Sequence, residues 1–235
     1  MTPHRKAGTI HAMKSNMPMK RRALLAAALA AASVPGAAQV RAPLVESAGR
    51  GELTRVEALL REGADIEQRD AAGRTAVLAA TDGHHVAVVR ALIARGADVN
   101  AQDGQRDSAF LLAGARGYTD IVRAALSAGA DLKSTNRYGG TALIPACHHG
   151  HVETVRLLLT TAIDVDHVNN LGWTALLEAV ILGDGGPAHA EIVRLLVARK
   201  ADVRLADREG VTPVTHARRR GQRVVEEILV RAGAR

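Results

Sequence analysis

Apolar residues recur along the chain in short clusters with helical spacing, and polar residues separate the clusters. Val155, Leu158 and Leu159 form one such cluster, and their spacing places all three on one face of a helix. The segment Asp70-Ala-Ala-Gly73 lies between two clusters, and it has the Asp and Gly residues that favour turns. The pattern predicts short helices that are separated by turns.

The clusters repeat with a fixed period. The segments EGADI (62–66), RGADV (95–99), AGADL (128–132) and TAIDV (161–165) are 33 residues apart, and RKADV (199–203) follows after 38. A Thr or Ser recurs in the same register, five residues after an Asp or Asn, at Thr75, Ser108, Thr141, Thr174 and Thr212. A period of this length is typical of a solenoid, in which each unit buries its apolar face only against its neighbours.

This pattern resembles the ankyrin repeat, which runs D-x-x-G-x-T-P-L-H-x-A-A-x-x-G-H, then an apolar helix, then G-A-D-V-N. Six copies are expected, at about residues 42–74, 75–107, 108–140, 141–173, 174–211 and 212–235. The resemblance implies an all-α repeat solenoid of stacked helix-turn-helix units with β-hairpin-like fingers between them.

Several marker positions have a physical role of their own. Thr75 and Thr141 are expected to cap helices by accepting a hydrogen bond from a free backbone N–H. Pro43 and Pro213 are expected at the first helical position, where a missing N–H does no harm. Gly63 is expected to end a second helix in the left-handed conformation, as are its equivalents in the next two units.

Some units depart from the pattern. Arg106 stands where the turn glycine is expected, and Gly104 lies two residues earlier, so we expect a finger of different shape. Ala162 and Lys200 replace the glycine that ends the second helix in the fourth and fifth units.

The stretch VILGDGGPAHAEIV (180–193) holds five extra residues. We expect Gly183 and His189 to take the Gly-His positions, and the insertion to comprise Asp184, Gly185, Gly186, Pro187 and Ala188. A phosphate-binding loop is disfavoured, because such a loop follows a strand and this one follows a helix. We expect a lengthened turn between two helices, which is either a tolerated surface insertion or a contact loop.

The N-terminal segment 1–38 is typical of an export signal. From Met19 it has a basic start, an apolar run at 23–32 and small residues before an expected cleavage after Ala38. The mature domain is then 39–235, periplasmic or secreted by the Sec or twin-arginine route, without stable membrane insertion. The alternatives are a membrane-tethered scaffold with an uncleaved N-terminal helix, a secreted effector and a cytosolic protein with a basic tail.

The formal net charge of +7 comes mostly from this segment. Residues 1–38 hold six basic residues and no acidic one, and the remaining 25 basic residues nearly balance 24 acidic residues. A neutral body lacks the basic surface that binds a phosphate backbone. We therefore expect no nucleic acid partner.

Two histidine-rich motifs, GHH (83–85) and CHHGH (147–151), raise the possibility of metal or catalysis. His151 takes a structural position of the repeat, Cys147 a buried one, and His148 and His149 exposed ones. No carboxylate or second cysteine stands nearby at ligand spacing. The sequence holds no catalytic motif either. We expect no enzyme activity, no metal and no cofactor.

The ankyrin resemblance implies that a protein partner docks on a concave face made of the fingers and the first helices. The candidate residues are Arg137, Tyr138, His148, His149, Asn170, Leu171, Trp173, Arg208 and Glu209. Tyr138 and Trp173 fall on adjacent fingers, and exposed Tyr and Trp are typical of interface hot spots. We expect a monomer with a protein partner that the sequence does not identify.

Overall fold

The computed structural model describes residues 42–235, so the predictions for 1–38 lie outside the described residues. The described part forms twelve helices and no strand. They are α1 (Pro43–Gly49), α2 (Leu53–Arg61), α3 (Ala76–Asp82), α4 (Val86–Ala94), α5 (Ala109–Arg116), α6 (Thr119–Ser127), α7 (Leu143–His148), α8 (Val152–Leu158), α9 (Ala175–Ile181), α10 (Pro187–Ala198), α11 (Pro213–Arg219) and α12 (Arg223–Arg231).

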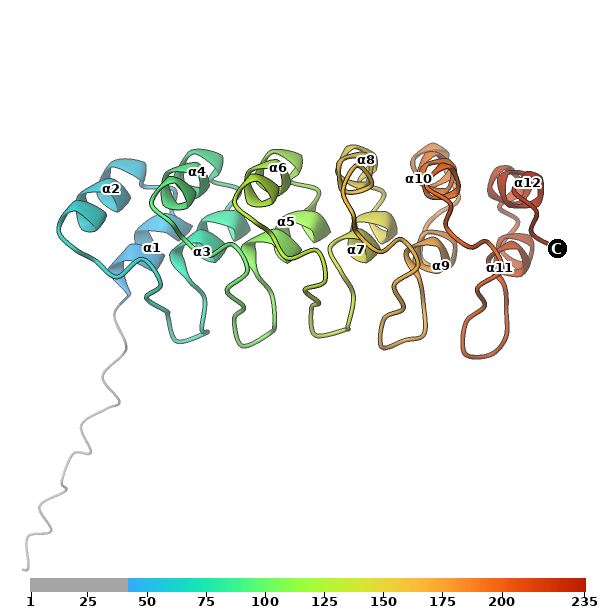
Figure 1. The fold of residues 1–235 in the computed structure, drawn as a ribbon, viewed down its shortest axis with the longest axis horizontal. Coiled ribbons are helices and arrows are strands. Elements are labelled where there is room, and N and C mark those ends of the chain that lie inside the picture. Colours follow the sequence, from blue (N-terminus) through green and yellow to red (C-terminus); the bar gives the residue numbers. More distant parts are fainter. Residues whose placement is uncertain (1–41) are drawn as a thin grey trace, which may run out of the picture. The chain divides into compact units, whose positions relative to one another are not determined.

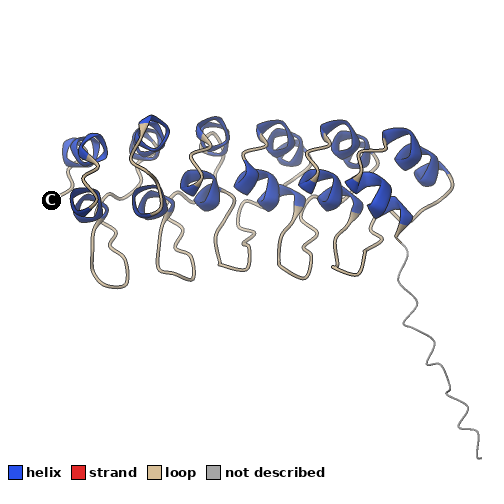
Figure 2. Cartoon of the chain, turned by 180° about the vertical axis from the view of Figure 1, so that it is seen from behind, coloured by secondary structure: helices blue, strands red, loops and turns tan. Residues whose placement is uncertain are grey.

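The helices form six pairs that stack in the order of the sequence. Each odd-numbered helix packs on the next odd-numbered one, and each even-numbered helix packs on the next even-numbered one. Figure 1 shows these as two rows, and the loops that join successive pairs extend to one side. Figure 2 shows the same rows from behind, with helices and loops alone in residues 42–235. The predicted all-α repeat solenoid is confirmed.

The core repeats from unit to unit because each unit contributes the same apolar and small positions. One apolar position of each odd-numbered helix is buried in all six units, as Leu44, Val77, Phe110, Leu143, Leu176 and Val214. Full burial of such a side chain stabilises the fold by about 1.5–3 kcal/mol. Small residues let successive helices of one row approach closely. A Cβ added at Gly114 in α5 would meet the Ala142 Cβ at 2.8 Å.

The helix caps match the prediction only in part. Ser108, Thr174 and Thr212 each accept a hydrogen bond from the backbone N–H three residues later. The predicted caps at Thr75 and Thr141 are wrong, because both hydroxyls are buried without a hydrogen-bond partner.

At Thr141 the N–H of Ile144, three residues later, donates to the Thr141 carbonyl at 3.2 Å and not to the hydroxyl. Pro145 has no N–H to donate to that carbonyl, and α7 begins at Leu143. Thr75 has nearly the same backbone angles as the working cap Thr174, so only its hydroxyl is placed differently. Pro43 and Pro213 begin α1 and α11 as predicted.

The fingers share one set of hydrogen bonds, including the finger with Arg106. Asp103 Oδ1 accepts from the backbone N–H groups of Gln105 (2.8 Å) and Asp107 (3.0 Å), and Asp70 Oδ1 accepts two equivalent bonds in the preceding finger. The different shape predicted for this finger is therefore wrong. Arg106 itself takes the left-handed conformation that glycine takes elsewhere, with a φ of 63°.

The ends of the second helices confirm the glycine prediction and show how two units manage without glycine. Gly63, Gly96 and Gly129 have φ values of 88°, 87° and 84°. Lys200 adopts the same conformation, with a φ of 66°. In the fourth unit α8 ends early, and the hydroxyl of Thr161 donates to the carbonyl of Leu158 at 2.6 Å.

The insertion in the fifth unit is only partly a turn. The left-handed residue is Gly185, with a φ of 70°, so the prediction that Gly183 takes this position is wrong. Pro187 and Ala188 belong to α10, which is lengthened to 12 residues by an extra N-terminal turn. His189 therefore lies inside the helix, yet it keeps its expected role, because its Nε2 lies 2.9 Å from the carbonyl oxygen of His148.

Candidate partner-binding site

The odd-numbered helices and the loops between units form one continuous surface, which we call the finger face. In its N-terminal half two arginines and two acids form ion pairs. Arg74 lies 2.8 Å from an Asp70 oxygen, and Asp82 lies 3.7 Å from Arg74 and 3.3 Å from Arg116. Asp70 and Asp82 therefore have arginine partners within the chain.

The middle of the finger face contains a largely apolar cavity, which we call the α7–α9 groove. It has a volume of about 420 Å³ and lies between two fingers and the helices α5, α7 and α9. Its walls are made by Asp107, Leu112, Ala115, Asn136, Arg137, Tyr138, Gly140, Ile144, Pro145, His148, His149, Asn169, Leu171, Glu178 and Leu182.

Large apolar side chains at the rim of this groove are open to solvent. Tyr138 is 54% exposed, Leu171 48% and Leu182 42%. They come from two successive fingers and from the end of α9, so three separate segments converge on one cavity. Convergence of exposed apolar groups is typical of an interaction surface, whereas single exposed ones are common on any protein.

The Glu178 carboxylate lies in the wall of the groove. Its side chain is 9% exposed, and α9 buries apolar residues on either side of it. Asn169 Nδ2 donates to its Oε1 at 2.8 Å, and His148 Nδ1 lies 3.7 Å from its Oε2. Burial raises the pKa of Glu178, because desolvation disfavours the charged form.

The histidines beside the groove are packed on each other. The rings of His148 and His149 stack with centroids 4.2 Å apart. Burial lowers the pKa of His148, and the neighbouring imidazoles of His149 and His189 lower it further. His148 therefore favours its neutral form beside Glu178.

The structure brings five of the nine predicted residues to the groove. They are Arg137, Tyr138, His148, His149 and Leu171. Of the other four, Asn170 and Arg208 link successive fingers, since the Arg208 guanidinium donates to the Asn170 carbonyl at 2.6 Å. Trp173 is half-buried and Glu209 is exposed, and neither lines the groove. The prediction that Tyr138 and Trp173 are both exposed is therefore confirmed for Tyr138 and wrong for Trp173.

Sequence reasoning missed Glu178 as a candidate. A signal was present, because Glu178 is the one acidic residue in the apolar segment ALLEAVI. An acid in the middle of a buried helix needs a partner or a function. The repeat pattern does not single out Glu178, because it specifies no residue type at that position.

The cysteine and the histidines form no reactive or metal-binding centre in the described part of the chain. Cys147 is fully buried, and desolvation raises its pKa well above the ordinary value, so the thiol stays protonated and unreactive. No group of three potential metal ligands occurs within residues 42–235.

Hydrogen bonds hold the insertion of the fifth unit against the start of α10. Asp184 Oδ1 accepts from the backbone N–H of Gly186 and from His189 Nδ1, both at 2.8 Å. The N–H of Gly186 and then the imidazole of His189 hold the pKa of Asp184 below its ordinary value. His189 in turn bonds the carbonyl of His148. A contact role for residues 184–188 stays a prediction.

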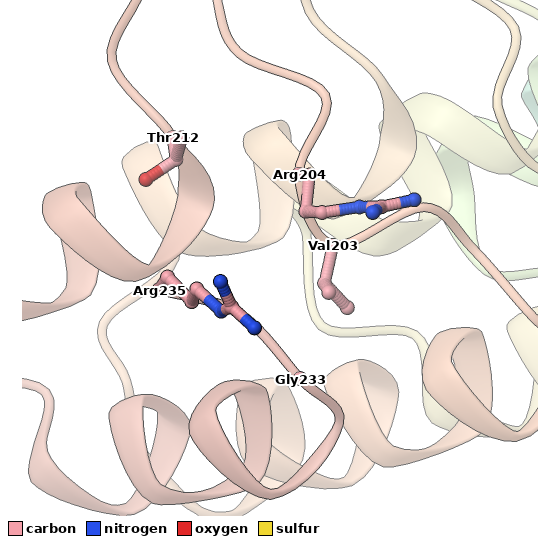
Figure 3. A pocket seen from close by; sticks show the side chains of 5 residues that line it. All are labelled: Val203, Arg204, Thr212, Gly233 and Arg235. Atoms are coloured by element: carbon pink, nitrogen blue, oxygen red, sulfur yellow. The ribbon is translucent and has the colours of Figure 1, made fainter.

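A second cavity, of about 380 Å³, lies at the C-terminal unit (Figure 3). Val203, Arg204, Thr212, Gly233 and Arg235 line it, and Arg204 is already 3.3 Å from Asp202. None of the predicted partner-binding residues lies there. Among the described helices, none has the length and apolar composition needed to cross a membrane.

Comparisons with known proteins agree with this architecture. The family described as "Ankyrin repeats (3 copies)" matches residues 13–103 and 109–207. The putative ankyrin repeat protein YahD of Escherichia coli (strain K12) is 42% identical over 57 residues, which are 24% of this chain and 28% of that protein. The alignment thus spans little more than a quarter of that relative.

Solved structures extend the likeness over most of the chain. An ankyrin repeat domain from Acinetobacter baumannii AYE is 51% identical, with a TM-score of 0.80 over 82% of this chain and 98% of that one. The ankyrin repeat domain of Bcl-3, described as a unique member of the IkappaB protein family, is 28% identical, with a TM-score of 0.74 over 84% and 88%. With the repeat register and the paired helices, these matches show that the chain belongs to the ankyrin-repeat family.

Proposed function

We propose that this chain captures a partner protein in the α7–α9 groove of its finger face. Ankyrin repeats are generally protein-interaction modules and are typically non-enzymatic. The observation that carries the proposal is the convergence of Tyr138, Leu171 and Leu182 on one cavity, each more than 40% exposed. Burying such a rim against a partner removes apolar surface from water, which favours association.

The charge pattern of the finger face also favours the α7–α9 groove over the N-terminal half as the binding site. In the N-terminal half Asp70 and Asp82 have arginine partners, so a partner would have to break these ion pairs to bind there. The α7–α9 groove offers exposed apolar side chains instead. Interface energy often concentrates at Tyr and Arg side chains, and the groove has both, Tyr138 and Arg137.

The proposed location is outside the cytoplasm, in a bacterial periplasm or secreted, and the proposed state is a monomer. The basic start, short apolar run and small residues of 1–38 support export. Mass spectrometry of the N-terminus of the natural protein tests this. Gln39 as the first residue is expected, whereas Met19 or an earlier residue would contradict cleavage and favour a tether.

The binding proposal is tested by capture with paired variants. The double variant Tyr138→Ala/Leu171→Ala removes two exposed groups at the groove. The control Val224→Ala/Val230→Ala removes two groups of α12 that are 49% and 45% exposed but lie away from it. The first variant is expected to lose a partner that the wild type and the control retain. Equal capture by all three would contradict the proposal.

A further inference from the structure

Glu178 is a carboxylate that folding has placed in the wall of the groove without full compensation. Its Oε1 is satisfied by Asn169 at 2.8 Å, whereas the nearest basic nitrogen to Oε2 is His148 Nδ1, at 3.7 Å. A distance of 3.7 Å is too long for a hydrogen bond. Oε2 is not among the buried side-chain atoms that lack a partner, so solvent reaches it, and an ionised carboxylate there accepts its hydrogen bonds from water or from a bound molecule.

Two other acids of the finger face are paired with a basic side chain, whereas Asp107, in the same groove, has no ion pair within 4 Å among residues 42–235. Asp70 is paired with Arg74 at 2.8 Å, and Asp207 lies 2.7 Å from His216 Nε2. The comparison with Asp207 is close, because His216 occupies in α11 the position that Glu178 occupies in α9. The contact between finger and helix thus joins the Asp207 carboxylate to the His216 imidazole in the sixth unit. In the fifth unit it joins the Asn169 amide to the Glu178 carboxylate.

The neighbours of Glu178 are not free to supply the missing donor. Asn169 Oδ1 accepts the backbone N–H groups of Leu171 (2.9 Å) and Trp173 (3.1 Å), which fixes the orientation of the amide. The His148 ring is stacked on His149. Arg137 lies over the Tyr138 ring, 4.8 Å from its centroid, and also donates to Gln105. The groove therefore lacks a cation at Glu178.

We propose that Glu178 is the anionic anchor of the α7–α9 groove, and that it receives a cationic side chain, Arg or Lys, from the bound segment of the partner protein. Apolar residues beside that cation would cover Tyr138, Leu171 and Leu182. The inference rests on the proposed function and deepens it by naming the chemistry of the partner. A charge-assisted hydrogen bond inside a partly dry groove discriminates more strongly than one in water.

The test uses the full chain, labelled with ¹⁵N, and two blocked peptides that differ in one group. The first is acetyl-Ala-Leu-Arg-Leu-Ala-amide, and the second has citrulline, the uncharged counterpart of arginine, in place of arginine. Peptides are titrated to millimolar concentration while backbone amide shifts are followed. The arginine peptide is expected to bind about tenfold more tightly, which corresponds to about 1.4 kcal/mol, with shifts at Leu171, Glu178 and Leu182. A lysine peptide is expected to behave like the arginine peptide.

Two variants make the result specific. Glu178→Gln keeps an oxygen for Asn169 but removes the charge, so the preference for arginine is expected to disappear. Glu46→Gln is the matched control, because Glu46 is exposed and occupies in α1 the position that Glu178 has in α9. It is expected to keep the preference. The thermal midpoint of Glu178→Gln, expected not to fall, shows that the variant is folded.

Three outcomes overturn the inference. They are equal binding of the arginine and citrulline peptides, retention of the preference in Glu178→Gln, and no binding of the arginine peptide at the groove. The proposed function has a separate readout, which is partner capture by the Tyr138→Ala/Leu171→Ala variant. If capture depended on Tyr138 and Leu171 but were unchanged in Glu178→Gln, the groove would still be the binding surface. Only the role of Glu178 as an anchor would be lost.

Discussion

The side-chain amide of Asn169 joins the fourth finger to helix α9 by donating a 2.8 Å hydrogen bond to the carboxylate of Glu178. Both residues are buried, since only 5% of Asn169 and 6% of Glu178, counted over the whole residue, is exposed. The same asparagine closes its own finger through two backbone N–H groups. One side chain therefore fixes both the finger that carries Leu171 and the acid in the groove wall.

Glu178→Gln is expected to stabilise the protein at neutral pH. The folded-state pKa of Glu178 lies above its ordinary value of 4.5 because of burial. The stability linked to its protonated form is therefore present below about pH 4.5 and is lost as the pH rises through the folded pKa. The midpoints of wild type and variant should be alike at low pH, and the variant should gain an advantage towards pH 7. A variant that melts lower at pH 7 would contradict the burial argument.

Asn169→Asp is expected to destabilise the fold, because it replaces the donor to Glu178 with a second carboxylate. The expected loss at pH 7 is about 1–3 kcal/mol, typical of a buried group that loses its partner. It should shrink as acid protonates the pair. Asn136→Asp is the matched control, since the residue at the Glu178 position of its unit is Pro145. Urea unfolding of both variants measures the difference, and equal losses would contradict this role of Asn169.

Thr75→Val and Thr174→Val are expected to change stability in opposite directions. The Thr75 hydroxyl is buried without a partner, so its removal should stabilise the fold by about 1 kcal/mol. The Thr174 hydroxyl accepts the N–H of Leu177 at 3.2 Å, so its removal should cost about 1 kcal/mol. Chemical unfolding curves give both values. A shift of the same sign in both variants would show that the two hydroxyls are equivalent.

Arg106→Gly is expected to stabilise the second unit by about 1 kcal/mol, because the left-handed conformation is costly for a residue with a Cβ. The opposite change in the next finger, Gly139→Ala, should destabilise. Gly139 has a φ of 72°, and an added Cβ would lie 2.5 Å from Asn170 Oδ1. Urea unfolding checks both variants. If Arg106→Gly destabilised, its 3.2 Å contact with Thr135 would outweigh the backbone strain.

The features that repeat could be predicted from the sequence. Pro43, Pro213 and Gly63 sit where the period places them, because their backbone roles are local. The hydroxyl direction of Thr75 could not be predicted, since Thr174 has nearly the same backbone and bonds differently. The conformation of Arg106 is imposed by hydrogen bonds within its finger, and its sequence position alone predicts only that glycine is missing.

The candidate site was less predictable from the sequence, because residues from separate segments of the chain come together to form it. Tyr138 and Leu171 share a repeat position, and their neighbourhood follows from the period. Trp173 occupies a finger position that the repeat pattern predicts to be exposed, but the stacked repeats leave it half-buried. The role of Glu178 depends on its distances to Asn169 and His148, which leave one carboxylate oxygen without a hydrogen bond from the chain, and the sequence does not contain these distances.

The central claim, that the α7–α9 groove binds a partner protein, is tested most directly by site-specific photo-crosslinking in the native host. A photo-reactive amino acid is placed at Tyr138 in one variant and at Val230, exposed on α12, in another. We expect a discrete partner linked covalently from position 138 and absent from position 230. No linked protein from position 138, or the same product from both positions, would contradict the claim.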